Sequence, residues 1–388
     1  MLKGKKILLG VTGGIAAYKA VELASILTKN GAKVKTILTK SACQLVNPLT
    51  FKSITHRSVS TELFNLENEI EHITLADWAD LIVIAPATAN MIGKVASGIG
   101  DDLLSTTIMA TSAPVLFVPA MNVHMYSNRV LQSNIEKLTR LDYYFMEPES
   151  GKLACGYEGK GRFPVITEIK YHIETFLNYS QDLTDKDILI TAGSCRENID
   201  PMRFITNHSS GRMGLALARA AHIRGAKVKV IAGIVQDNIP EYINALQVEN
   251  AEDMYQAVTA EASEHQMIIM AAAVSDFTPV KTSQQKIKKT DSLTLKLKKT
   301  KDILQELGDN KQKDQILIGF AAESEDLEKN ARIKLKNKHL DLIIANNIAV
   351  AGQQDTAILI LGENITAKFS GSKFSVAHKI LDFIYYEK

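Results

Sequence analysis

Cys155 lies in the middle of the stretch SGKLACGYEGKGR (Ser150–Arg162), in which four of thirteen residues are glycine. A free thiol has a pKa of ~8.5, so at pH 7 it is mostly protonated and can act as an acid. The alternative is a small buried side chain, the common role of a free cysteine. The glycines predict a pliable segment, and the residue pattern alone leaves both roles open.

Two further glycine-rich segments begin helices, where backbone N–H groups can hold an anion. Gly13-Gly14 precedes a helix whose dipole places about half a unit of positive charge at its start, although a plain tight turn would look the same. Ile190–Gly214 is a long polar segment that leads into a second helix, and structureless insertions of this length are uncommon unless functional. Neither half contains GxGxxG, which weakens any dehydrogenase interpretation.

Charged residues of the second half are placed where phosphates could bind. Asp276 ends the buried segment AAAVSDF, a position suited to contact a nucleotide or Mg²⁺. The lysines of KIKK (Lys286–Lys289) follow, and lysines neutralise transferring phosphates as mobile point charges. The alternation of LKLKK (Leu295–Lys299) is more typical of a solvated strand edge.

The hydrophobic pattern alternates strands with helices and then restarts. The expected fold class is therefore α/β, with two Rossmann-like three-layer domains whose sheets are mostly parallel. Ligands in such sheets bind beyond the carboxyl ends of the strands. AILILG and ITAKFS predict a hairpin before a last helix, SVAHKILDFIYYE. The other expected strands are Lys5–Thr12, Ala32–Thr39, Ala79–Thr88, Ala113–Asn122, Asp187–Gly193, Ala226–Gly233 and those in MIIMAAAVSDF, ILIGFAAES and DLIIANNI, with helices at Ile15–Asn30 and Gly211–Arg224.

Composition excludes several classes of protein. Hydrophobic residues make up 46% and charged residues 23%, as in globular proteins. A net charge of +2 is too small for a general nucleic-acid or membrane surface. The purest apolar run, Met267–Val274, is far shorter than the ~20 residues of a membrane span. Cys43, Cys155 and Cys195 are few and far apart, which argues against disulfides or zinc. We expect a cytoplasmic protein without nucleic-acid or membrane partners.

The first half resembles the flavin-dependent cysteine decarboxylases, among them the 4'-phosphopantothenoylcysteine decarboxylases. GVTGGIAAYK, HITLADWADLIVIAPATAN, PAMN and ACGYEGKGR carry the resemblance in order and spacing. It implies a flavodoxin-like domain in residues 1–186, with His72 as base or orienting residue. It also implies that Asn122 binds the substrate carboxylate or amide and that Cys155 is a proton donor on a flap. The residues implied to hold FMN are Gly14, Ile15, Thr39, Thr88, Ala89 and Asn90.

The resemblance to the decarboxylases implies a chemical role for Cys155. The flavin would oxidise the substrate thiol, CO2 would leave, and the resulting enethiol would need a proton at carbon. A protonated Cys155 could supply that proton, while the glycines let the flap close and exclude water. Simpler roles stay open: His72 as a solvated or capping residue, Asn122 as the cap of the segment MYSNRVLQ, and Cys155 as a packed side chain.

Residues 187–388 resemble the phosphopantothenate–cysteine ligases of the CTP-using bacterial type, through DPMRFITNHSSGRMG, AAAVSDF, KIKK and GFAAES. The resemblance implies that CTP and Mg²⁺ activate the carboxylate of 4'-phosphopantothenate as an acyl-cytidylate, from which the amine of cysteine displaces CMP. Asn207 would stabilise or orient the acyl-cytidylate, and Lys286 would contact the phosphates. No metal ligands are assigned. The residues implied to bind CTP are Met270, Ala271, Ala272, Asp276, Lys286, Lys301, Asp302, Ile303, Leu304, Phe320, Lys334 and Lys338.

Two positions depart from the ligase pattern. The family commonly reads TAG-Pro-Thr-x-Glu where this chain has Ser194-Cys195, and Lys301 replaces a proline often found before the pair Asp302-Ile303. A cysteine is a poorer hydrogen-bond donor than threonine, so the role of Cys195 is in doubt. Neither change affects Asn207, Asp276 or Lys286, and we therefore keep the expected activity.

Together the halves imply one bifunctional enzyme, because the ligase product is the decarboxylase substrate and the final product would be 4'-phosphopantetheine. One alternative is a decarboxylase of C-terminal cysteines in peptides, which would have no use for a CTP site. Another is a regulatory flavoprotein, against which His72, Asn122 and Cys155 argue. The resemblance also implies a homo-oligomer, in which decarboxylase trimers and ligase dimers would close into a dodecamer.

Overall fold

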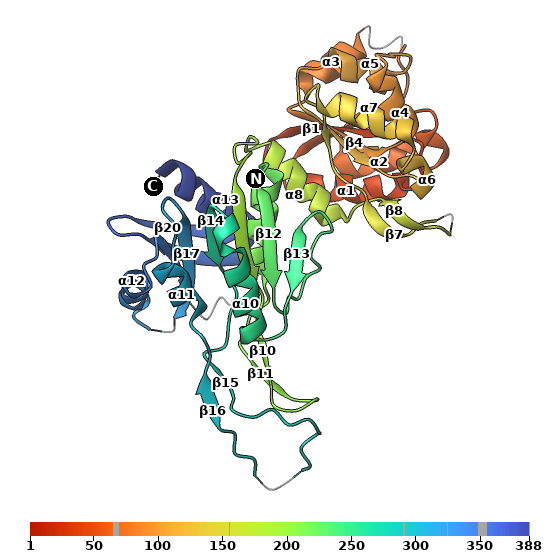
Figure 1. The fold of residues 1–388 in the computed structure, drawn as a ribbon. Coiled ribbons are helices and arrows are strands. Elements are labelled where there is room, and N and C mark those ends of the chain that lie inside the picture. The colour runs from red at the N-terminus through yellow and green to blue at the C-terminus, as the bar shows by residue number, and fades with distance from the viewer. Residues whose placement is uncertain (65–69, 155, 290–291, 324, 348–354, 388) are drawn as a thin grey trace. The chain divides into compact units, whose positions relative to one another are not determined.

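The computed structural model describes residues 1–388 except 65–69, 155, 290–291, 324, 348–354 and 388. The chain forms two compact units, Met1–Ser180 and Gln181–Lys388, each with its own sheet (Figure 1). The structure divides the chain between Ser180 and Gln181, six residues before the expected boundary between residues 186 and 187. Asp182 and Leu183 belong to the C-terminal unit, since both hydrogen-bond to Arg224.

The N-terminal unit has a six-stranded parallel sheet in the order β3-β2-β1-β4-β5-β6. This is the Rossmann order 3-2-1-4-5-6, and without the short edge strand β3 it becomes the flavodoxin-like order 2-1-3-4-5. The expected α/β class is confirmed. The strands are β1 (Lys6–Val11), β2 (Lys33–Leu38), β3 (Val59–Ser60), β4 (Leu81–Ala87), β5 (Val115–Pro119) and β6 (Tyr144–Phe145).

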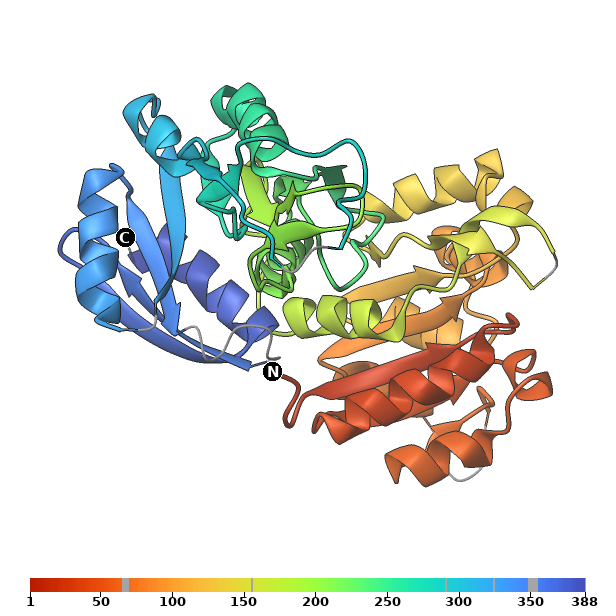
Figure 2. The same ribbon diagram turned by 90° about the horizontal axis from the view of Figure 1, so that it is seen from below.

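Helices cover both faces of this sheet (Figure 1, Figure 2). Side chains alternate along each strand, so Ile7 and Leu9 join one core cluster whereas Leu8 joins the cluster on the other face. A hairpin of β7 (Glu149–Lys152) and β8 (Glu158–Arg162) follows β6. The helices are α1 (Ala17–Lys29), α2 (Pro48–Thr55), α3 (Glu71–Trp78), α4 (Ala89–Ala96), α5 (Leu103–Ala110), α6 (Val123–Tyr126), α7 (Arg129–Thr139) and α8 (Ile166–Phe176), with a 3-10 turn at Ala42–Gln44.

The C-terminal unit has an eight-stranded sheet in the order β13-β12-β9-β14-β17-β18-β19-β20. The first six strands are parallel and again follow the Rossmann order, while β19 and β20 form the expected antiparallel hairpin. The strands are β9 (Asp187–Ala192), β12 (Lys227–Ala232), β13 (Asn244–Gln247), β14 (Met267–Met270), β17 (Ile316–Glu323), β18 (Leu342–Asn347), β19 (Asp355–Leu361) and β20 (Thr366–Ser372).

Two small antiparallel pairs stand outside that sheet, β10 (Arg196–Asn198) with β11 (Phe204–Thr206) and β15 (Phe277–Pro279) with β16 (Leu297–Lys299). The second pair is the root of a long exposed arm that extends beyond the sheet (Figure 1). The helices of this unit are α9 (Arg212–Ile223), α10 (Ala251–Glu261), α11 (Ile303–Asp309), α12 (Leu327–Asn337) and α13 (Lys373–Asp382), with a 3-10 turn at Ala262–Glu264 and a π turn at Phe383–Glu387.

A buried ion cluster joins the start of the C-terminal unit to its last helix. Arg224 is fully buried and pairs with Asp182 at 2.6 Å and with Asp382 at 2.7 Å. Tyr386 also donates a hydrogen bond to Asp182. The neighbouring His378 is fully buried, and burial together with the positive charge of Arg224 lowers its pKa to about 3. His378 is therefore neutral in the native state at pH 7.

Candidate active sites

Each sheet has a point where the strand order reverses, between β1 and β4 in one unit and between β9 and β14 in the other. Open α/β sheets bind ligands in the crevice beyond the carboxyl ends of the strands at such points. The loops that carry the predicted site residues lie at these two edges.

The loops after β1 and β4 are joined by the hydroxyl of Thr12. Its Oγ1 donates to the carbonyl oxygen of Pro86 at 2.7 Å and accepts from the amide of Thr88 at 3.0 Å. Gly13 allows Ser41 to approach, because a Cβ at Gly13 would overlap the Ser41 side chain. Gly14 lies between the loops after β4 and β5. A Cβ added at Gly14 would be 3.5 Å from Cγ2 of Thr88 and 3.7 Å from the Ala120 carbonyl oxygen.

The residues predicted to hold FMN therefore follow β1, β2 and β4 and gather at one edge of the sheet. Two helices begin there without a side-chain cap, α1 after Ala16 and α4 after Thr88, so their first amides can face an anion. Thr39 also lines a cavity of about 300 Å³ together with Asp102. Ile15 is exposed at 66% on the same edge.

Asn122 caps a helix, as one of the simpler interpretations predicted. The capped helix is the short α6, which begins before the segment MYSNRVLQ. Its Oδ1 accepts from the amide of His124 at 2.8 Å. His72 is half-buried in the first turn of α3. Cys155 lies outside the described residues, in the sequence between β7 and β8. Which role each residue plays stays a prediction.

The glycines of β8 allow close contact with the Asn122 loop. A Cβ at Gly161 would overlap the carbonyl oxygen of Met121, and one at Gly159 would lie 2.8 Å from a methyl group of Val123. The amide of Met121 also donates to the Gly161 carbonyl oxygen at 3.0 Å. These two glycines therefore hold the hairpin against the Asn122 loop, a different task from the pliability that the sequence suggested.

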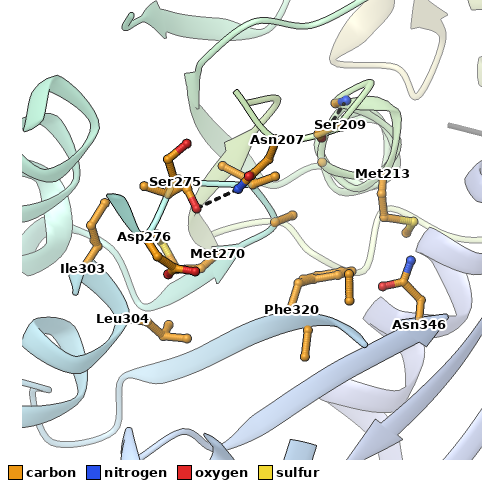
Figure 3. A pocket seen from close by; sticks show the side chains of 18 of the residues that line it. Asn207, Ser209, Met213, Met270, Ser275, Asp276, Ile303, Leu304, Phe320 and Asn346 are labelled. Carbon is orange, nitrogen blue, oxygen red and sulfur yellow. Dashed lines mark hydrogen bonds between the residues drawn. The ribbon is translucent and has the colours of Figure 1, made fainter. Parts of the chain in front are cut away.

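In the C-terminal unit a cavity of about 790 Å³ opens at the corresponding edge of the sheet. Its lining includes Asn207 and every residue predicted to bind CTP except Lys286. Figure 3 shows Asn207 and Asp276 on one side of the cavity and Phe320 on the other. The amide nitrogen of Asn207 donates to the Val274 carbonyl oxygen at 3.0 Å, which fixes the direction of its side chain.

The start of α9 supplies part of the lining that the sequence analysis did not assign. Gly211 has φ of 72° and precedes α9, which has no side-chain cap. Gly214 lies against β9, where a Cβ would be 2.7 Å from that of Ala192 and 2.8 Å from the carbonyl oxygen of Thr191. The glycine spacing in SSGRMG carried this signal, because close helix–strand packing is one use of such a glycine.

Several lysines give the lining a positive character, and Lys301 and Lys338 have acidic partners. Lys301 pairs with Glu252 at 2.8 Å and lies 4.1 Å from the ring centre of Tyr255. Lys338 pairs with Asp302 at 2.9 Å. Asp302 also caps α11, because its Oδ1 accepts from the amide of Gln305 at 3.1 Å. Lys301 thus takes part in the cavity at the position where the family has proline.

The hydroxyl of Ser275 adds an unused polar group to this lining. Ser275 is 4% exposed, and its Oγ has no hydrogen-bond partner among the described residues. Buried polar groups are nearly always paired, so this oxygen is suited to a ligand. Its neighbour Thr300 donates to the Ser275 carbonyl oxygen at 2.6 Å and holds the segment in place.

Lys286 lies on the exposed arm and is not part of the lining. The adjacent Ile287 is held by Asp200, whose side chain is fully buried, and by the guanidinium of Arg203, which donates to the Ile287 carbonyl oxygen at 2.7 Å. Hydrogen bonds from Arg203 and from the amides of Met202 and Ile287 hold the pKa of Asp200 far below its usual range. Asp200 and Arg203 therefore fix the arm at Ile287.

Cys195 occupies the hydrophobic core. It is fully buried among residues such as Leu189 and Ile231, and burial raises the pKa of its thiol to about 12. Its carbonyl oxygen accepts from the hydroxyl of Thr206 at 2.7 Å. The side chain thus acts as a small apolar group, which answers the doubt that its departure from the family raised.

Across the described ranges, no three His, Cys, Asp or Glu side chains are grouped so that they could hold a metal ion. Among the helices of those same ranges, none combines the length and apolarity that crossing a membrane requires.

Comparison with known proteins identifies relatives of both units. The family model Flavoprotein matches residues 1–178, and the model DNA/pantothenate metabolism flavoprotein C-terminal domain matches residues 183–386. The chain is 49% identical over 358 residues to the coenzyme A biosynthesis bifunctional protein CoaBC of Bacillus subtilis, covering 91% of this chain and 88% of that protein. The protein of the same name from Borreliella burgdorferi is 43% identical over 390 residues, covering 99% and 100%.

Among solved structures, the chain is similar to the C-terminal domain of a CoaBC protein. The sequence identity is 37%, the match covers 53% of this chain and 96% of that domain, and the TM-score is 0.47. A PPC decarboxylase mutant complexed with pantothenoylaminoethenethiol is 29% identical, covers 45% of this chain and 98% of that one, and has a TM-score of 0.41.

Proposed function

We propose, since this chain belongs to the family of coenzyme A biosynthesis bifunctional proteins CoaBC, that its two units catalyse consecutive reactions. The C-terminal unit would join 4'-phosphopantothenate to cysteine at the expense of CTP. The N-terminal unit would decarboxylate the product to 4'-phosphopantetheine with FMN. The single observation that carries the ligase assignment is the 790 Å³ cavity, where residues from eight segments of the chain meet around one space.

The cavity offers suitable partners for each part of a nucleotide. In the proposed arrangement Asp276 contacts the nucleotide, while Phe320, Lys334 and Lys338 surround the base, and uncapped amides at the start of α9 face the phosphates. The carboxylate of 4'-phosphopantothenate attacks the α-phosphorus and pyrophosphate leaves. The amine of cysteine then attacks the acyl carbon and CMP leaves. Asn207 would orient the acyl-cytidylate through the amide that Val274 holds in place.

Mg²⁺ fits this arrangement as a companion of the triphosphate. The described residues offer no complete protein cage for a metal, and Mg²⁺ usually keeps waters and binds one or two carboxylates plus substrate phosphates. Asp276 is the carboxylate we propose for it. Lys286 would reach the phosphates only if its arm closes over the cavity.

The N-terminal edge fits FMN because three loops converge on Gly14 and two uncapped helices begin beside it. FMN supplies reversible two-electron oxidation of the substrate thiol. Gly14, Ile15, Thr39, Thr88, Ala89 and Asn90 would bind it. Asn122 would hold the substrate carboxylate or amide, His72 would orient or deprotonate it, and Cys155 would deliver a proton to carbon. Gly159 and Gly161 bring β8, which follows Cys155 in the sequence, onto the Asn122 loop.

The experiment is a mass spectrum of products from purified protein given 4'-phosphopantothenate, cysteine, CTP and Mg²⁺. 4'-Phosphopantetheine and CMP are expected. No product, even when 4'-phosphopantothenoylcysteine is supplied directly, would refute the proposal and favour a regulatory flavoprotein. Cys155→Ser should keep bound flavin and lose turnover, and an unchanged yield would remove the acid role.

We further propose a homo-oligomer, because Ile15 and Tyr18 expose 66% and 61% of their side chains on the first turns beside the FMN edge. Such apolar exposure at a site edge favours cover by a second copy. Decarboxylase trimers and ligase dimers would combine into a dodecamer, which a native mass measurement tests directly.

A further inference from the structure

We propose that Lys373 and Arg212 form a phosphate-binding subsite at one end of the C-terminal cavity, separate from the residues assigned to the nucleoside. The inference rests on the proposed ligase function and deepens it. Both side chains line the cavity, and the proposed steps use neither of them.

The two cations come from helices that pack together. Lys373 is the first residue of α13 and Arg212 the first of α9, and these two helices pack against each other. Asn346 of β18 and the buried Thr356 of β19 line the cavity with them and add polar groups. Figure 3 shows Met213 and Asn346 on the far side of Phe320 from Asp276. Met213, which follows Arg212 in the chain, and Asn346, which lines the cavity with the pair, thus lie across Phe320 from Asp276 (Figure 3).

Two cationic side chains line the cavity at this end. Asp237 pairs with Arg212, at 3.0 Å from its Nε and 3.3 Å from a terminal nitrogen. Lys373 is half-buried, and its pKa is lowered, first by burial and then by the charge of Arg212; Asp237 acts in the opposite direction but is the weakest of the three influences. Arg212 and Lys373 therefore repel each other, and a bound anion would relieve this repulsion.

The lysines assigned to the nucleotide have carboxylate partners within the protein. Lys301 and Lys338 have carboxylate partners at 2.8 Å and 2.9 Å. Their charges are already neutralised by the protein, whereas Lys373 lacks such a close ion pair among the described residues. A lysine that is half-buried, directed to a cavity and beside an arginine is suited to a doubly charged oxyanion.

The ligand class is a phosphate group, and the proposed reaction has two sources of it. One is the outer phosphates of CTP, which leave as pyrophosphate. The other is the phosphate of 4'-phosphopantothenate. A cavity of about 790 Å³ lies within the range of ~300–1,000 Å³ typical of ligand sites and has room beyond one nucleoside.

The test is calorimetric binding to the full chain in the absence of CTP and cysteine. Inorganic pyrophosphate is one probe, and 4'-phosphopantothenate against unphosphorylated pantothenate is the other. Lys373→Met removes the charge, Lys373→Gln serves if that variant does not fold, and Lys373→Arg keeps the charge. Lys368→Met, an exposed lysine on β20 outside the lining, is the matched control.

We expect Lys373→Met to weaken the affinity for one of the two probes by at least about tenfold, as loss of a charged hydrogen bond does. The affinities of Lys373→Arg and Lys368→Met should stay within about threefold of the parent. Loss of pyrophosphate binding identifies the nucleotide phosphates as the source. Loss of the advantage of 4'-phosphopantothenate over pantothenate identifies the substrate phosphate. The subsite is overturned if neither probe weakens, or if Lys373→Arg loses as much as Lys373→Met. Turnover plays no part, so an inactive ligase that still binds pyrophosphate would refute only the proposed function.

Discussion

Replacement of Gly214 by alanine tests the contact that brings α9 to the cavity. The added Cβ would lie 2.7 Å from the Cβ of Ala192, 2.8 Å from the carbonyl oxygen of Thr191 and 3.0 Å from the Cα of Ala192, where ordinary contacts begin at 3.4 Å. All three atoms belong to β9 in the centre of the sheet, so they cannot rotate away. The helix must move instead.

Two effects of opposite sign decide the size of the change. Alanine in a helix interior is favoured over glycine by roughly 0.5–1 kcal/mol. Overpacking of a well-filled contact costs typically 1–3 kcal/mol. We therefore expect Gly214→Ala to lower the free energy of unfolding of the C-terminal unit by about 1–2 kcal/mol. At ~2–4 °C per kcal/mol for a unit of this size, Tm should fall by roughly 2–8 °C.

Gly93→Ala in α4 is the matched control. Its added Cβ would meet only the side-chain amide of Asn134, at 3.9 Å, so the helix gain should appear without the clash. The assays are thermal unfolding and the rate of CMP release. The Gly214→Ala variant should also raise KM for CTP, since its helix start moves, while decarboxylation of supplied 4'-phosphopantothenoylcysteine stays normal. If Gly214→Ala stabilises the protein as Gly93→Ala does, the packing argument is wrong.

Three other changes test separate parts of the structure. The pKa of His378 is about 3 in the native state, whereas in the unfolded chain a histidine takes up a proton below pH ~6.5. Protonation therefore favours the unfolded chain, and stability is lost as pH falls. The free energy of unfolding should drop by roughly 2 kcal/mol from pH 7 to 5 in urea titrations, and His378→Leu should flatten this slope. Asp200→Asn should release the arm of Lys286 and cut ligase kcat/KM at least about tenfold, with Asp314→Asn as an exposed control; equal rates would separate the arm from catalysis. Gly161→Ala should impair decarboxylation and spare CMP release, because its Cβ would overlap the Met121 carbonyl; normal decarboxylation would contradict that contact.

Local pattern was enough to predict the α/β class and the edges of the sheets that carry the site residues. Strand and helix periods are visible over a few residues, and parallel strands place all their carboxyl ends on one side. Residues as distant as Asn207, Asp276 and Phe320 could therefore be expected at one edge, and the structure brings them to one cavity. The resemblance to known families then supplied proposed roles that periodicity could not.

Contacts between distant elements were decided by the tertiary structure. The neighbourhood of Lys373 and Arg212 depends on how α13 packs against α9, and the place of Lys286 outside the cavity depends on the bonds of the arm to Asp200 and Arg203. The use of Gly161 as a contact to Met121 could not be distinguished from pliability in the sequence. The sequence by itself determined which residues lie at the ends of strands, because that property is local. Which of them meet depends on side-chain packing between elements far apart in the chain, and only the folded structure contains it.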